Sequence, residues 1–373
     1  MNEIENILQK QVETNKSPSV QYILCDEEKI IKRYYIGFAD IKEKKGVDDN
    51  TSYNVLSVTK TFTALAILQL AEQKKLDIEQ PVIKYLNDFQ YSPEITIRQL
   101  LTHAAGIPNP IPLSWVHLVT ENKSFDRNQF FRNIFNKNLR IKSKPNEKFA
   151  YSNLGYILLG QLIEKVSGIS YEAYIEDNIL KKLGIKTNEL GFEIGETTKH
   201  AKGYIKRFSF YNLILSLFID KTKYMDKSEG RWKPFKNYYV NGAAYGGLIG
   251  TPDAFVKYIQ ELLKSNCQLI TDEYKKLLFT ENLTNERKPT GMCIAWFSGQ
   301  LNGKKYFAHA GGGGGYYVEI RIYPDSGIGS LVFFNRTGMS DERFLDKVDK
   351  IIYRKVTKVK GYEKTNNVEH HYT

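Results

Sequence analysis

Cysteine is scarce in this chain, and its few copies are widely separated. There are three, at Cys25, Cys267 and Cys293. An odd number of scattered cysteines supplies neither a disulfide framework nor the paired CxxC ligands of a zinc knuckle. The sequence therefore predicts neither a disulfide framework nor a cysteine-bound metal, and we expect no metal and no cofactor.

Long apolar runs are also missing. The longest, from Leu213 to Ile219, falls far short of the roughly 20 residues that span a bilayer. The first residues, MNEIENILQK, are polar and acidic, and they lack the basic and apolar regions of a signal peptide. As given, the sequence predicts a cytoplasmic protein, or an exported one if a precursor segment has been removed.

The overall composition is that of a globular protein with a basic surplus. Hydrophobic residues make up 42% and charged residues 25% of the 373 residues, which excludes disordered, collagen-like and coiled-coil chains. At about 150 residues per domain, this length predicts two domains, or one domain with an insertion. The net charge of +11 is spread over several stretches. No recognition motif accompanies it, so we expect no nucleic-acid partner and at most weak contact with anionic surfaces.

The order of the predicted elements indicates an antiparallel sheet built from both ends of the chain. Hydrophobic periodicity predicts an initial helix over the first fifteen residues, followed by strands at 19–25 and 30–37. Late in the chain it predicts strands at 292–297, 305–310, 317–323 and 328–334, and then a closing helix at about 341–356. Helices dominate the middle, for example at 57–74, 154–166 and 252–264. This is an α+β fold, an α/β sandwich whose sheet is flanked by N- and C-terminal helices, with an inserted mainly helical domain.

The same order sets the expected domain boundaries. Residues 1–76 and 241–360 would form the discontinuous sheet domain, 77–240 the helical domain and 361–373 a tail. Within the helical domain, residues 204–240 are unusually aromatic. Their apolar part, 210–219, is hydrophobic nearly all round, so we expect it to be buried or to contact something apolar. It would either cover the core or form a wall or lid over the active site.

The motif Ser57-Val58-Thr59-Lys60 opens one of the predicted helices. The spacing places Lys60 one turn from Ser57 on the same face. An amine there can accept the serine proton and activate the hydroxyl, and the helix N-terminus favours an oxyanion. The alternative is an N-cap serine followed by a surface lysine, because SxxK also occurs by chance in a lysine-rich chain.

Tyr151-Ser152-Asn153 directly precedes another predicted helix. A nearby cation favours phenolate, so a tyrosine beside a lysine can carry a lowered pKa. An asparagine amide can hydrogen-bond both a substrate carbonyl and a lysine. The alternative is a turn in which Asn153 caps the helix and Tyr151 lies in the core.

His309-Ala310-Gly311, followed by Gly312 to Gly315, ends a predicted strand. Glycines at such a place let a substrate approach the backbone, whose N–H groups can bind an oxyanion. A flexible hairpin loop is the alternative. The run lacks the strand–GxGxxG–helix context of a dinucleotide site, so we expect no nucleotide cofactor.

Taken together, the three motifs in this order and spacing resemble the serine β-lactamase and penicillin-binding-protein superfamily. The most similar branch is the class C-like group, which includes esterases, D-aminopeptidases and D-Ala-D-Ala peptidases. The resemblance extends from about residue 15 to 357. It includes the stretches 37–40 (GFAD), 96–107 (TIRQLLTHAAGI), 151–159 (YSNLGYILL) and 246–253 (GGLIGTPD).

The resemblance implies roles for the residues of the first two motifs. Ser57 would be the acylated nucleophile, and Lys60 would assist its deprotonation. Tyr151 would be the general base, and the acid toward the leaving group. Asn153 would orient the substrate and Lys60. His103, in the LLTH stretch, is interpreted as structural.

In the third motif, the resemblance implies that the backbone N–H groups of Gly312 and Ser57 form the oxyanion hole, beside Gly311. His309 stands where true β-lactamases have the lysine of a KTG motif. A lysine supplies a permanent cation for the carboxylate of a β-lactam, whereas histidine is mostly neutral at pH 7. The class A deacylating glutamate has no identifiable counterpart, which leaves Tyr151 to activate water.

The function implied is a serine hydrolase that acts through an acyl-enzyme on an ester or amide. Its substrate would be a small ester, a D-amino-acid peptide or a β-lactam-like molecule, with weak or no β-lactamase activity. Two alternatives stay open. One is a non-catalytic penicillin-binding-like protein with a binding or signalling role, and the other is a cell-wall or membrane-associated factor.

Overall fold

The computed structural model describes residues 3–337 and 343–363. Within them, a seven-stranded antiparallel sheet has the order β11-β12-β13-β14-β1-β2-β3. Its strands are β1 (Ser19–Cys25), β2 (Ile30–Asp40), β3 (Lys45–Gly46), β11 (Phe297–Leu301), β12 (Lys304–Gly313), β13 (Tyr316–Tyr323) and β14 (Ile328–Phe334). The two ends of the chain meet where β1 pairs with β14, with Val20 opposite Phe334. The predicted fold class is confirmed.

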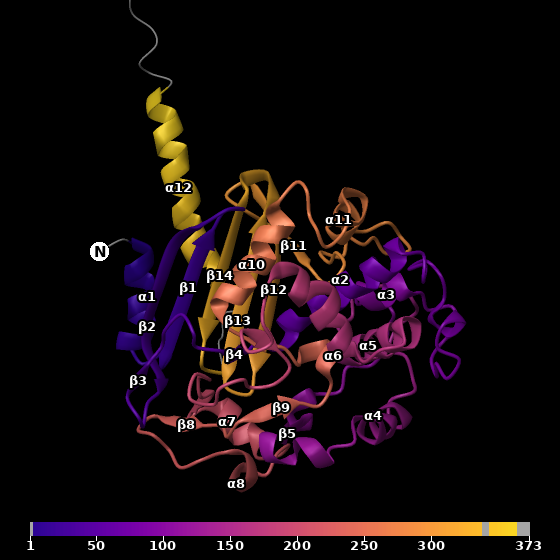
Figure 1. Cartoon of the computed structure of the whole chain (residues 1–373), viewed down its shortest axis with the longest axis horizontal. Helices are drawn as coiled ribbons and strands as arrows, with labels where there is room; N and C mark the ends of the chain where they lie inside the picture. The colour runs from indigo at the N-terminus through magenta and orange to yellow at the C-terminus, as the bar shows by residue number, and fades with distance from the viewer. Residues whose placement is uncertain (1–2, 338–342, 364–373) are drawn as a thin grey trace, which may run out of the picture.

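Alternating side chains of the central strands create one hydrophobic layer on each face of the sheet. Val20, Tyr22 and Leu24 of β1 pack with α1 (Glu3–Glu13) and α12 (Leu345–Glu363). Ile23 belongs to the layer on the other face, which includes α10 (Pro252–Leu263). Successive side chains of a strand point to opposite faces, so the sheet is covered on both sides. Figure 1 shows α10 lying across one face.

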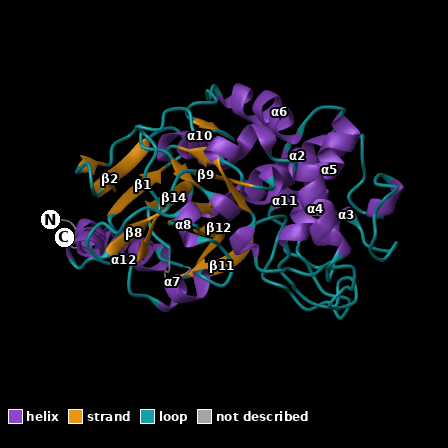
Figure 2. Ribbon diagram, turned by 90° about the horizontal axis from the view of Figure 1, so that it is seen from below, coloured by secondary structure: helices purple, strands orange, loops and turns teal. Residues whose placement is uncertain are grey.

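The helical side of the molecule is organised around α2 (Thr59–Glu72). Every residue of α2 from Thr59 to Ala71 is buried. A helix that is buried all round belongs in the middle of a fold, and α2 contacts α5 (Asn153–Ser167), α9 (Ala243–Gly246) and α11 (Asp272–Leu278). In Figure 2 the strands lie on one side together with α10 and α12, whereas α2, α5 and α11 lie on the other.

The remaining elements are short. The helices are α3 (Ile97–Leu101), α4 (Arg127–Asn136), α6 (Tyr171–Ile175), α7 (Phe210–Leu215) and α8 (Lys221–Tyr224). The strands β4 (Tyr53–Asn54), β6 (Leu190–Gly191) and β10 (Ile249–Gly250) form a small sheet, and β5 (Val116–Leu118) pairs with β9 (Tyr238–Val240). The last pair is β7 (Tyr204–Lys206) with β8 (Trp232–Pro234). Among the described residues, no helix combines the length and the apolar character needed to cross a membrane.

Two local predictions were wrong, and a third holds only in part. Residues 292–296 form a buried turn, with Ala295 in the left-handed region at φ 62°, and the strand begins only at Phe297. The closing helix begins at Leu345 and continues through 361–363 of the predicted tail; residues 341–342 and 364–373 lie outside the described residues. The segment 210–219 is only half buried, since Leu213 and Leu217 are 69% and 81% exposed. The domain boundaries stay a prediction.

Candidate active site

Ser57 lies on a strained turn at the entrance of α2. A short 3-10 turn (Leu56–Val58) leads directly into the helix, and Leu56 has φ 51°. A non-glycine residue in this left-handed region is strained, and such strain is typical of functional sites. The turn leaves Ser57 partly accessible at the helix N-terminus, while the helix behind it is buried.

Lys60 is fully buried one turn beyond Ser57. Its Nζ lies 3.1 Å from Ser57 Oγ, 2.8 Å from Asn153 Oδ1 and 2.7 Å from the carbonyl oxygen of Tyr245. The prediction that Ser57 and Lys60 share a face is confirmed, and the alternative of a surface lysine is wrong.

Burial holds the pKa of Lys60 well below its usual range, because the charged form loses its hydration. A neutral amine has two N–H donors and one lone pair. The two donors match the oxygens of Asn153 and Tyr245, and the lone pair then faces the hydroxyl of Ser57. In the protonated form the third N–H donates to Ser57 Oγ instead. The same three contacts therefore accommodate both the neutral and the protonated amine of Lys60.

Three tyrosine rings surround the amine. Lys60 Nζ lies 5.0 Å from the ring centre of Tyr151, 5.4 Å from that of Tyr156 and 5.3 Å from that of Tyr245. The faces of aromatic rings attract cations. They therefore offset part of the cost of burying the protonated amine, which lets Lys60 receive a proton during a reaction.

Tyr151 also contacts Ser57. Its hydroxyl donates to Ser57 Oγ at 3.0 Å. Its ring packs on the imidazole of His103, with ring centres 4.1 Å apart, and His103 Nδ1 accepts the backbone N–H of Ser152 at 3.1 Å. His103 thus fixes both the ring and the backbone of the Tyr151-Ser152-Asn153 motif.

The side chains of Ser152 and Asn153 do not have the roles expected for a simple turn, in which Asn153 would cap the helix. Ser152 is the N-cap of α5, and its hydroxyl accepts the N–H of Gly155 at 3.1 Å. Asn153 is therefore not the cap. Its side chain is free to turn inward to Lys60, and its backbone N–H donates to Asn109 Oδ1 at 3.0 Å.

Gly311 explains how β12 approaches the serine so closely. A Cβ at Gly311 would lie 2.1 Å from the carbonyl oxygen of Val55 and 2.9 Å from Ser57 N. Only glycine permits this contact, so the strand runs directly beside the backbone N–H of Ser57. At the neighbouring Gly312, a Cβ would meet only the ring of Tyr317, at 3.7 Å.

The glycine loop beyond β12 is anchored. The carbonyl oxygen of Gly314 accepts the hydroxyl of Tyr238 at 2.9 Å, and that of Gly315 accepts the N–H of Tyr204 at 3.2 Å. Gly315 N also donates to Thr337 Oγ1. These contacts hold the end of β12 in place beside Ser57.

His309 is buried and neutral. It is 1% exposed, and its Nδ1 lies 2.9 Å from the carbonyl oxygen of Ala310, which makes Nδ1 the protonated nitrogen. Burial, together with repulsion from Lys60, lowers its pKa to about 3. Nε2 has no hydrogen-bond partner within the described part of the chain. The position therefore supplies no cation at neutral pH.

The family model described as Beta-lactamase matches residues 4–353. The chain belongs to the Beta-lactamase family. Relatives include Penicillin-binding protein 4* of Bacillus subtilis strain 168, 27% identical over 79% of this chain and 63% of that protein. Protein flp of Staphylococcus aureus strain MW2 is 34% identical over 49% of this chain and 37% of that protein. The matches thus span less than two thirds of these relatives' own length.

Solved structures of the same fold cover nearly the whole chain. The octameric penicillin-binding protein homologue from Pyrococcus abyssi has a TM-score of 0.76 at 25% identity, covering 94% of this chain and 77% of that one. The D-amino acid amidase from Ochrobactrum anthropi SV3 has a TM-score of 0.75 at 19% identity, covering 96% and 98%. The amidase shows the likeness of fold alone.

For this member of the Beta-lactamase family, sequence reasoning missed several contacts of the site. The carbonyl oxygen of Tyr245 and the rings of Tyr156 and Tyr245 carry no motif that sets them apart from core tyrosines. His103 was interpreted as structural, yet it packs directly on Tyr151. The LLTH stretch identifies His103 in the sequence, but only the fold shows that its ring contacts Tyr151.

Proposed function

We propose that this protein is a serine hydrolase that cleaves an ester or amide through an acyl-enzyme on Ser57. One observation carries the proposal: Ser57 Oγ lies within hydrogen-bond distance of both Lys60 Nζ, at 3.1 Å, and the Tyr151 hydroxyl, at 3.0 Å. A hydroxyl between two groups that can exchange protons is the arrangement of an activated nucleophile.

In the acylation step, Ser57 Oγ attacks the carbonyl carbon of the substrate, and its proton passes to the neutral amine of Lys60. The carbonyl oxygen becomes an oxyanion. The backbone N–H groups of Ser57 and Gly312 stabilise it, because β12 runs beside Ser57 N. Tyr151 then donates its proton to the leaving group as the bond to the carbonyl carbon breaks, and Lys60 returns a proton to Tyr151.

In the deacylation step, water attacks the acyl carbon and the bond to Ser57 Oγ breaks. Tyr151 is the group placed to take the proton of the water, because its hydroxyl already lies at Ser57 Oγ, and as it does so its own hydroxyl proton passes to the neutral amine of Lys60. The proton that Ser57 recovers comes from the same Tyr151–Lys60 pair. General acid–base catalysis of this kind contributes about 10²–10⁴-fold in rate.

The environment of His309 favours neutral acyl groups over anionic ones. A β-lactam carries a carboxylate, and a neutral imidazole offers it no charge. The pKa of about 3 keeps His309 uncharged over the physiological range. We therefore place esters and D-amino-acid amides or peptides ahead of β-lactams as substrates.

A panel of substrates tests the proposal. Acylation rates and intact masses are measured with a p-nitrophenyl ester, a D- and an L-amino-acid amide, a D-Ala-D-Ala depsipeptide and benzylpenicillin. Ser228→Ala, at an exposed serine, is the control for Ser57→Ala. We expect turnover of the ester and the D-amide, slow acylation by penicillin, and no covalent mass in Ser57→Ala. Binding of these compounds without any adduct would instead identify a non-catalytic binding protein.

A further inference from the structure

The surface around α7 carries six exposed apolar side chains within eleven residues. They are Phe208 (86% exposed), Phe210 (71%), Tyr211 (56%), Leu213 (69%), Leu217 (81%) and Phe218 (36%). We call this set the α7 patch. Single exposed apolar residues are ordinary, but a contiguous group of this kind marks an interaction surface. The α7 and α8 helices lie at the lower edge of the molecule in Figure 1.

The residues of the α7 patch are not needed to complete the hydrophobic core. The inner side of the same segment is already formed by Asn212, Leu215 and Ile219, which are buried. A surface helix ordinarily buries one face and presents polar residues on the other. Here the outward face is mostly apolar as well, with Ser216 as an exposed polar residue among the apolar ones.

Cations border the α7 patch on both sides in the sequence and in space. Lys206 and Arg207 precede it, and the guanidinium of Arg207 lies 4.9 Å from the ring centre of Phe208. Lys221 follows it and donates to the carbonyl oxygen of Asn212. On the neighbouring β8 strand, Lys233 lies opposite Ile205. With Arg231, these residues form what we call the cation rim.

The members of the cation rim lie close enough to repel one another. Burial lowers the pKa of Lys206, and repulsion from Arg336, Lys16 and Arg231 lowers it further. Burial and repulsion from Lys233 do the same for the pKa of Lys221. Two of the nearby acids are engaged elsewhere, whereas Asp226, whose backbone N–H bonds to Pro234 of β8, is exposed. Asp220 caps α8, and Glu121 pairs with Lys223 at 2.6 Å.

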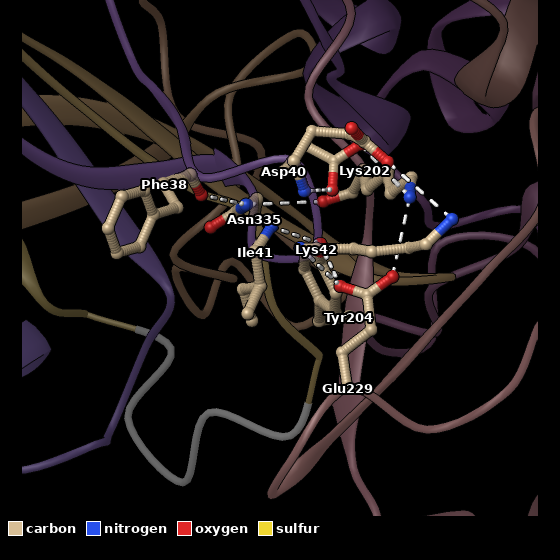
Figure 3. Close-up of polar contacts among 9 residues, drawn as sticks. Phe38, Asp40, Ile41, Lys42, Lys202, Tyr204, Glu229 and Asn335 are labelled. Carbon is tan, nitrogen blue, oxygen red and sulfur yellow. Dashed lines mark hydrogen bonds and ion pairs between the residues drawn. The ribbon is translucent and has the colours of Figure 1, made fainter.

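The base of this region is fixed to the end of β2 by a polar cluster. Glu229 accepts the hydroxyl of Tyr204 at 2.9 Å and the N–H of Lys42 at 3.1 Å, and its carboxylate lies 3.3 Å from Lys202 Nζ (Figure 3). Lys202 also lies 3.0 Å from Asp40 at the end of β2. The α7 patch is therefore presented on a supported base.

We propose that the α7 patch and the cation rim together form a docking surface for an anionic lipid bilayer. Aromatic and leucine side chains bordered by lysine and arginine match the boundary between acyl chains and anionic headgroups. The long basic side chains can reach the headgroups while the apolar side chains enter the boundary. The net charge of +11 adds long-range attraction to such a surface.

A second copy of this chain fits the same surface poorly. In a twofold contact each patch faces its own copy. The cation rim of one copy would then meet the cation rim of the other, and like charges brought together oppose association. An anionic bilayer satisfies both the apolar side chains and the cations, and we therefore commit to it as the occupant.

Vesicle sedimentation tests the proposal without reference to catalysis. The 373-residue chain is mixed with vesicles of phosphatidylcholine alone, or with about 30% phosphatidylglycerol, at low and high salt, because salt screens surface charge. We expect co-sedimentation only with the anionic vesicles, weakened at high salt. Phe208→Ser combined with Leu217→Ser should lower the affinity about tenfold or more. Arg231→Gln should lower it about fivefold on anionic vesicles.

Leu139→Ser is the matched control, because Leu139 is 48% exposed and lies outside the α7 patch. It should leave vesicle binding unchanged, and thermal unfolding of all variants should match the parent. The proposal is overturned if anionic vesicles fail to sediment the parent protein, or if the control weakens binding as much as the patch variant. It is also overturned if sedimentation velocity shows an oligomer that the patch variant dissociates, since the surface then belongs to a second copy.

Discussion

Replacing Gly311 by alanine tests the closest backbone contact of the site. The added Cβ would lie 2.1 Å from the carbonyl oxygen of Val55 and 2.9 Å from Ser57 N. Close C···O contacts in proteins are about 3.3–3.6 Å, so β12 has to retreat by about 1 Å. Both obstacles are backbone atoms, which cannot rotate away as a flexible side chain does.

The retreat separates the two proposed oxyanion donors, Ser57 N–H and Gly312 N–H. A displacement of about 1 Å in an active site costs about 10²-fold in rate, equivalent to about 2.7 kcal/mol in the barrier. We expect Gly311→Ala to lower the acylation rate on a p-nitrophenyl ester by about that factor. The rate is measured as the pre-steady-state release of p-nitrophenol.

Gly46→Ala is the matched control on the edge strand β3. There a Cβ would meet only the carbonyl oxygen of Gly37, at 3.9 Å, so the acylation rate should equal that of the parent. Circular dichroism and thermal unfolding establish that both variants are folded at the assay temperature. A folded Gly311→Ala protein that acylates at the parent rate would refute the account of β12 as one side of the oxyanion hole.

Three further predictions concern the proton carriers and His309. Tyr151→Phe keeps the ring on His103 but removes the hydroxyl, and turnover should fall about 10²-fold or more; an unchanged rate would assign the proton transfers to Lys60 alone. Because burial lowers the pKa of Lys60, the acylation rate should rise with pH and level off well below the pKa of an ordinary lysine, and a rate that still climbs at the usual lysine pKa contradicts this. His309→Lys adds a cation, so acylation by benzylpenicillin should increase relative to a neutral ester in a competition assay. A constant ratio would show that this position does not face the substrate carboxylate.

Much of the fold followed from local patterns in the sequence. The run from Ser19 to Cys25 predicted a strand, and in the structure Ile23 of that strand enters one hydrophobic layer while Tyr22 and Leu24 enter the other. Ser57 and Lys60 are separated by one helical turn, so their contact also followed from spacing. Family resemblance supplied the pairing of Ser57 with Tyr151, which spacing alone does not contain.

Other features depend on tertiary contacts that no local pattern records. Residues 292–296 are apolar because they are buried, and their backbone is a turn with Ala295 in the left-handed region. Burial and strand formation favour the same residue types, so the pattern did not separate them. The carbonyl oxygen of Tyr245 at Lys60 is a backbone atom, and any residue type at that position supplies it.

The segment 210–219 shows the limit of a hydrophobicity argument. Its all-round apolar character correctly predicted that Leu215 and Ile219 are buried, but Phe210 and Leu217 are exposed. An apolar segment favours contact with another apolar surface, but the sequence does not show whether that surface belongs to the same chain.

The central claim is that Ser57 is the acylated nucleophile. Its most direct test is the intact mass of the protein after reaction with a fluorophosphonate probe, followed by peptide mapping of the modified site. We expect a single adduct on the peptide that contains Ser57, and no adduct in a folded Ser57→Ala protein. An adduct that persists in Ser57→Ala, or that maps to a peptide without Ser57, would contradict it.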